Sequence, residues 1–154
     1  MPVLEATDRG IFPEPPQAEE RPAAVPEQKR FPRSVLLVED NPGDIRLVRE
    51  AVASSSVHPR LTIAQDGLEA LRMLQKDGKK PDLILLDLNL PALDGRALLR
   101  RIKTDPELHR IPIIVLTSSD ARQDVSSAYE LHANCYMVKP ADFAGLERAL
   151  HRLL

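Results

Sequence analysis

Short apolar runs alternate with helix-like segments from Ser34 to the carboxyl terminus, and this alternation limits the chain to few folds. The runs "VLLV", "LILL" and "IIVL" are continuous rather than alternating, which is typical of strands covered by helices on both faces. Segments such as "GLEALRMLQK" and "DFAGLERALHRLL" carry apolar residues at helical spacing. Because strand and helix follow one another five times, we predict an α/β fold. It is a doubly wound, five-stranded parallel sheet with five helices.

The first 33 residues have a different composition from the rest of the chain. Half of the 14 prolines lie there, among mixed charges and without apolar periodicity. We expect residues 1–33 to form a Pro-rich, flexible arm and residues 34–154 to form the folded domain. The arm is either a solvated tail or a segment that docks on another subunit through Ile11 and Phe12.

Composition excludes several classes of protein. A net charge of −2 offers no basic surface for nucleic acid. The single cysteine, Cys135, cannot form an intramolecular disulfide, lies in the apolar stretch "NCYMV", and is expected in the core of a protein from a reducing compartment. Neither an apolar run of about 18 residues nor a secretory pattern is present. We therefore expect a cytoplasmic protein without a membrane span.

Polar residues follow four of the predicted strands where each strand ends. They are Glu39 and Asp40 after "VLLV", Asp87 and Asn89 after "LILL", Thr117 and Ser118 after "IIVL", and Lys139 and Pro140 after "YMV". In an open parallel sheet, ligands bind at the carboxyl ends of the strands. The sequence therefore predicts that these residues share one site.

The acidic residues of this predicted site indicate a metal ion. Carboxylates about 4 Å apart repel by about 4 kcal/mol per pair at an effective dielectric of about 20, and one lysine cannot offset this. Mg²⁺ prefers oxygen ligands and binds beside phosphate groups, so the site favours phosphoryl chemistry. A solvated acidic edge without an ion is the simpler alternative.

The type of phosphoryl chemistry follows from what the first turn contains. No GxxxxGK[ST] motif follows the first strand, which disfavours a nucleoside triphosphate site. The acidic turn "EDNPGD" would repel the phosphate of a flavin mononucleotide. Asp87 itself is then the candidate nucleophile, and it would form an aspartyl phosphate.

The motifs "VEDN", "LLDLNLP", "VLTSSD" and "NCYMVKP" resemble the receiver domain of bacterial two-component response regulators, over about Ser34 to Leu154. The segments "VEDNPGDIRLVREA" and "ANCYMVKP" further resemble the single-domain regulators encoded beside phytochrome kinases. The resemblance implies a flavodoxin-like sheet of strand order 2-1-3-4-5.

The resemblance also implies a role for each residue of the predicted site. Asp87 would be the phosphoacceptor, and Lys139 would contact the phosphate. Asp40 would bind Mg²⁺ directly, Glu39 mainly through water, and Asn89 through its backbone carbonyl.

Other implied roles concern switching and turnover. Thr117 would hydrogen-bond a phosphoryl oxygen after activation, and Tyr136 would move inward with it. The Lys139–Pro140 peptide bond would be cis. Asn89 and Ser119 would tune slow self-dephosphorylation.

One position departs from the family pattern. The family has "LGAN" where this chain has "LHAN", so His132 would occupy a left-handed helix cap, a conformation that histidine tolerates better than most residues. We expect the other histidines, His58, His109 and His151, at the surface.

The predicted function is that of a phosphorylatable single-domain regulator. A sensor histidine kinase, with a bacteriophytochrome as the candidate, would phosphorylate Asp87, and the signal would pass through protein–protein contacts, plausibly of a homodimer. Two alternatives remain open. A phosphatase of the dehalogenase type would turn over phosphate esters, and a pseudo-receiver would act only as a docking module.

Overall fold

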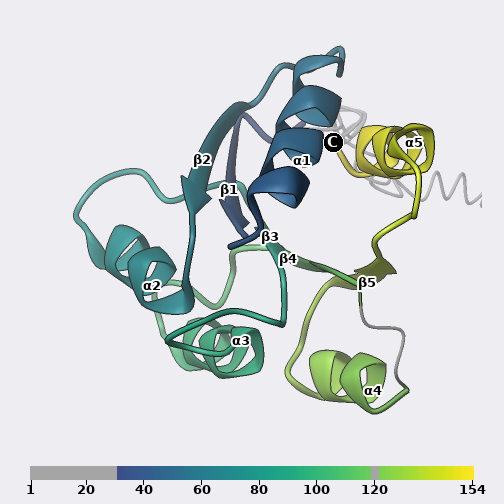
Figure 1. The fold of residues 1–154 in the computed structure, drawn as a ribbon. Coiled ribbons are helices and arrows are strands. Elements are labelled where there is room, and N and C mark those ends of the chain that lie inside the picture. Colours follow the sequence, from purple (N-terminus) through teal and green to yellow (C-terminus); the bar gives the residue numbers. More distant parts are fainter. Residues whose placement is uncertain (1–30, 119–121) are drawn as a thin grey trace, which may run out of the picture. The chain divides into compact units, whose positions relative to one another are not determined.

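The computed structural model describes residues 31–118 and 122–154, which form alternating strands and helices (Figure 1). The strands are β1 (Ser34–Val38), β2 (Arg60–Ala64), β3 (Leu83–Leu86), β4 (Ile113–Thr117) and β5 (Cys135–Val138). The helices are α1 (Pro42–Ala53), α2 (Gly67–Gln75), α3 (Gly95–Thr104), α4 (Arg122–Glu130) and α5 (Phe143–Leu153).

The five strands form one parallel sheet in the order β2-β1-β3-β4-β5, which confirms the predicted fold class and strand order. Helices α1 and α5 cover one face, and α2, α3 and α4 lie on the other side (Figure 1). The direction of strand progression reverses between β1 and β3. In open α/β sheets, sites form where the strand order reverses, outside the carboxyl ends of the strands.

The core consists of two apolar layers, because successive residues of a strand point to opposite faces of the sheet. In β1, Leu36 and Val38 belong to the layer that includes α2, α3 and α4, whereas Val35 and Leu37 belong to the layer under α1 and α5. Strands β1, β3 and β4 are buried along their whole length. This explains why their sequences show continuous apolar runs.

Among the described residues, four helices begin with a side chain that accepts a backbone N–H of the first turn. The capping residues are Asn41 for α1, Asp66 for α2, Asp94 for α3 and Asp142 for α5. Each cap satisfies a donor that the helix itself leaves unpaired. Since these helices follow strands, the caps lie in the connections that leave the carboxyl edge of the sheet.

Several local predictions can be compared with the structure. His132 has φ 64°, so the left-handed cap is confirmed. His58, His109 and His151 are exposed, as expected. Cys135 is half-buried and packs against the layer under α1 and α5.

Residues Phe31–Leu154 form one compact unit. Ile11, Phe12 and the rest of residues 1–30 lie outside the described residues, as does Ser119. Among the helices that the structure describes, none has the length and apolar character needed to cross a membrane.

Candidate functional site

Glu39 and Asp87 continue two neighbouring strands of the sheet beyond their last residues. The backbone N–H of Glu39 donates to the carbonyl of Ala64 at 3.0 Å, and that of Asp87 donates to the carbonyl of Val38 at 3.0 Å. The ladder therefore extends past β1 and β3 and sets the two carboxylates at the same edge. This is the convergence that the sequence predicted.

Carboxylates from the two strands meet in one group. Oxygen atoms of Glu39, Asp40 and Asp87 all lie within 4.8 Å of one another. Glu39 and Asp87 are buried, whereas Asp40 is exposed. Hard cations such as Mg²⁺ take oxygen ligands and usually keep several waters, which an exposed carboxylate allows. The donor set and its spacing fit a magnesium ion.

Lys139 follows β5, and its ammonium group contacts carboxylates of this group. Its Nζ lies 2.5 Å from Glu39 Oε2, 2.7 Å from Asp44 Oδ2 and 3.1 Å from Asp87 Oδ2. The backbone N–H of Lys139 donates to the carbonyl of Thr117 at 2.8 Å. The extended pairing of β4 and β5 therefore aims the lysine at the carboxylates.

Asp44 was not among the predicted site residues. It stands in the first turn of α1, at the end of the segment "EDNPGD", whose acidic character by sequence argues only against a flavin phosphate. The available signal was an acid four residues after Asp40. Its contact with Lys139 depends on how α1 packs on the sheet, which spacing alone does not indicate.

Each buried carboxylate is held by two kinds of donor. Glu39 accepts from the N–H of Asn41 at 3.0 Å on Oε1 and from Lys139 on Oε2. Asp87 accepts from the N–H of Asn89 at 3.1 Å on Oδ1 and from Lys139 on Oδ2. Both side chains are thereby fixed in orientation before any ligand binds.

Burial and charge act in opposite directions on these groups. Burial raises the pKa of Glu39 to about 7, although hydrogen bonds from Lys139 and Asn41 favour its charged form. Burial alone would lower the pKa of Lys139, but its hydrogen bonds to Asp44 and Glu39 outweigh this and raise it. Lys139 is therefore a permanent cation at the centre of the site.

Gly95, the first residue of α3, packs directly against the backbone of Asp87 and Leu88. A Cβ atom at this position would lie 2.3 Å from the carbonyl oxygen of Asp87 and 2.6 Å from the Cα of Leu88. The N–H of Gly95 donates to the carbonyl of Leu88 at 3.0 Å, and Leu88 is fully buried. Helix α3 therefore starts in direct contact with the segment that carries Asp87.

The expectation of a cis Lys139–Pro140 bond is wrong. Among the described residues no peptide bond is cis, so this bond is trans. The trans isomer of an X–Pro bond is favoured by about 0.5–1 kcal/mol. With the trans bond Lys139 already contacts the carboxylates, so the geometry requires no other isomer.

The remaining predicted residues lie at different depths. Thr117 is fully buried at the end of β4, and Tyr136 on β5 is half-buried against the layer that includes α2, α3 and α4. Asn89 is exposed, two residues after Asp87. The structure therefore brings Glu39, Asp40, Asp87 and Lys139 together.

Comparisons with known proteins show the family of the chain. The chain matches the response regulator receiver domain family over residues 35–151. It is 48% identical over 120 residues to the response regulator Rcp1 of Synechocystis sp., an alignment that covers 75% of this chain and 82% of Rcp1.

Two solved structures are similar to this one. The phosphorylated cyanobacterial phytochrome response regulator RcpA has a TM-score of 0.74 and 44% identity, over 79% of this chain and 90% of RcpA. The Mn²⁺-bound form of Rcp1 has a TM-score of 0.73 and 45% identity, over 79% of this chain and 91% of Rcp1. The chain belongs to the response regulator receiver domain family, and its relatives include phytochrome response regulators.

Proposed function

We propose that this chain accepts a phosphoryl group from a sensor histidine kinase onto Asp87, in a reaction that requires Mg²⁺. The observation that carries the proposal is the meeting of Asp87 with two further carboxylates and one lysine at the edge of the sheet. Similarity to a phosphorylated phytochrome regulator and to a Mn²⁺-bound regulator supports it. A kinase of the bacteriophytochrome type is the candidate donor.

Asp87 is suited to act as the nucleophile. A carboxylate oxygen of Asp87 attacks phosphorus, the phosphorus–nitrogen bond of the donor breaks, and imidazole leaves. The hydrogen bonds to Asp87 from Asn89 and Lys139 orient the carboxylate for an in-line approach. Bound Mg²⁺ would neutralise negative charge that develops on the phosphoryl oxygens.

The other residues of the site would hold the ion and the phosphoryl group. Asp40 would bind the metal directly, Glu39 mainly through water, and Asn89 through its backbone carbonyl. Lys139 would contact a phosphoryl oxygen as a point charge.

Switching and dephosphorylation would use a second group of residues. Thr117 would donate to the phosphoryl group, and Tyr136 would shift with it, so that phosphorylation biases an existing equilibrium. Asn89 and Ser119 would set the rate of hydrolysis by water. The chain would thus act as a cytoplasmic, phosphorylation-dependent partner in protein–protein contacts, including a homodimer, and not as a multiple-turnover enzyme.

Phosphoramidate tests the proposal, because its phosphorus–nitrogen bond resembles that of phosphohistidine. We expect the full chain to gain one phosphoryl group that hydroxylamine and base remove, as for an acyl phosphate, in Mg²⁺, and to gain none after chelation of the metal. Asp87→Asn should abolish labelling. Asp82→Asn is the matched control, because Asp82 precedes the same strand at its opposite end. Labelling that persists in Asp87→Asn would refute the assignment.

A further inference from the structure

Lys139 uses its whole donor capacity in this structure. An ammonium group has three N–H donors, and Lys139 makes three short contacts, one each with Glu39, Asp44 and Asp87. A phosphoryl oxygen that comes to lie beside Lys139 must therefore replace one of these carboxylates as acceptor.

Asp44 differs from the other two acceptors. Its side chain is 35% exposed, against 2% for Glu39 and 8% for Asp87, so water can solvate it when the lysine leaves. It is also outside the group of three carboxylates that fits a metal ion, and it stands on helix α1 rather than at a strand end. Of the three contacts, the one with Asp44 costs least to break.

We infer that Asp44 is a positioning residue that holds Lys139 before phosphorylation and competes with the phosphoryl group for it. The inference rests on the proposed function and extends it to α1. Asp44 weakens the binding of an incoming anion in two ways. It occupies a donor of Lys139, and its charge repels the anion. Its effect on a cation at the carboxylate group is the opposite.

A purely structural role for Asp44 has to be separated from this one. Asp44 is the third residue of α1, and its N–H donates to the cap Asn41 at 3.1 Å. Glu69 is the third residue of α2, and its N–H donates to the cap Asp66 at 2.7 Å. Acids in a first turn stabilise a helix through its dipole. Glu69 is likewise an acid in the first turn, but its Oε2 accepts from the backbone N–H of Gln65 at 2.7 Å, whereas Lys139 contacts Glu39, Asp44 and Asp87, so Glu69→Gln is the control for Asp44→Asn.

The experiment titrates the full chain with Mg²⁺ alone and then with beryllofluoride at saturating Mg²⁺, followed by ¹H–¹⁵N spectra. In Asp44→Asn we expect beryllofluoride to bind about fivefold more tightly and Mg²⁺ to bind about two- to fivefold more weakly, from the loss of one nearby charge. Asp44→Glu should restore wild-type affinities. Glu69→Gln should change neither affinity.

Other results would overturn the inference. Unchanged or weaker beryllofluoride binding in Asp44→Asn would show that Asp44 does not compete for Lys139. Equal loss of thermal stability without Mg²⁺ in Asp44→Asn and Glu69→Gln, with both affinities unchanged, would assign Asp44 to the helix alone. If the wild-type chain itself binds no beryllofluoride in Mg²⁺, the proposed function fails and the inference fails with it.

Discussion

The two consecutive strand–helix units β3–α3 and β4–α4 have similar strands and very different helices. Both strands are fully buried. Helix α3 buries Gly95, Leu98, Leu99 and Ile102, whereas α4 buries only Ala128 among its side chains. The unit that carries Asp87 is thus anchored more firmly through its helix than the unit that carries Thr117.

This difference suggests a division of roles along the sheet edge. A nucleophile has to be held in place, because small displacements of reacting groups reduce rate strongly. An element that responds to phosphorylation has to be drawn from the less stable part of the structure. Under the proposed function, helix α3 would meet the first requirement and α4 the second.

The largest expected effect comes from removing core side chains on the two helices. Leu99→Ala on α3 should lower the free energy of unfolding by about 2–5 kcal/mol, because Leu99 is fully buried. Val125→Ala on α4 should lower it by less than about 1 kcal/mol, because Val125 is only half-buried. Urea denaturation measures both. Equal losses would mean that α4 is anchored as firmly as α3.

The contact between α3 and Asp87 can be tested at Gly95. Gly95→Ala should destabilise the fold by about 1–3 kcal/mol and weaken Mg²⁺ binding, because the new Cβ would press on the backbone of Asp87. Gly43→Ala is the control, since a Cβ there meets only the end of the Asn41 side chain, at 3.1 Å. Wild-type Mg²⁺ affinity in a folded Gly95→Ala variant would argue against α3 as the support of the nucleophile.

Hydrogen exchange with beryllofluoride and Mg²⁺ compares the response of the two helices. We expect altered amide exchange in α4, β5 and α5 but little change in α3, with a coupling of about 1–3 kcal/mol. Thr117→Ala should reduce the change, because Thr117 is fully buried at the end of β4 and pairs with β5 beside Lys139. Changes of the same size in α3 and α4, or an undiminished response in Thr117→Ala, would contradict this division.

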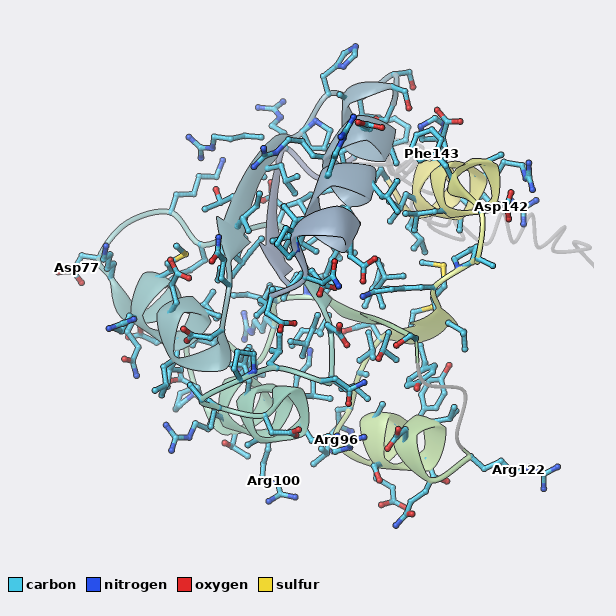
Figure 2. All side chains as sticks on the ribbon, in the orientation of Figure 1. Asp77, Arg96, Arg100, Arg122, Asp142 and Phe143 are labelled. Carbon is cyan, nitrogen blue, oxygen red and sulfur yellow. The ribbon has the colours of Figure 1, made fainter. Side chains whose placement is uncertain are left out.

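The smallest effect concerns the ion pair that joins the two helices. Arg96 on α3 lies toward α4 and pairs with Asp124 of α4 (Figure 2). Arg96→Gln should cost less than about 1 kcal/mol in unfolding free energy, because both side chains are partly exposed. It should also speed amide exchange in α4 more than in α3. Amide exchange that changes only in α3 would show that the ion pair stabilises α3 rather than α4.

The sequence predicted the fold because burial on both faces leaves continuous apolar runs, and β1, β3 and β4 have them. It predicted the acidic group as well, because residues that follow parallel strands must share one edge. It missed the contact of Asp44 and the support from Gly95, and its cis bond at Lys139–Pro140 was wrong. These depend on how helices and loops pack, which residue spacing does not encode.

The order of residues by itself determined which side chains stand at the carboxyl edge of the sheet, because a strand's end is a local property of the chain. Only the tertiary structure decided which of them touch. Lys139 contacts Asp44 across 95 positions of sequence and Asp87 across 52. Such pairings arise from the packing of helices on a twisted sheet, where a shift of one ångström decides whether a hydrogen bond forms.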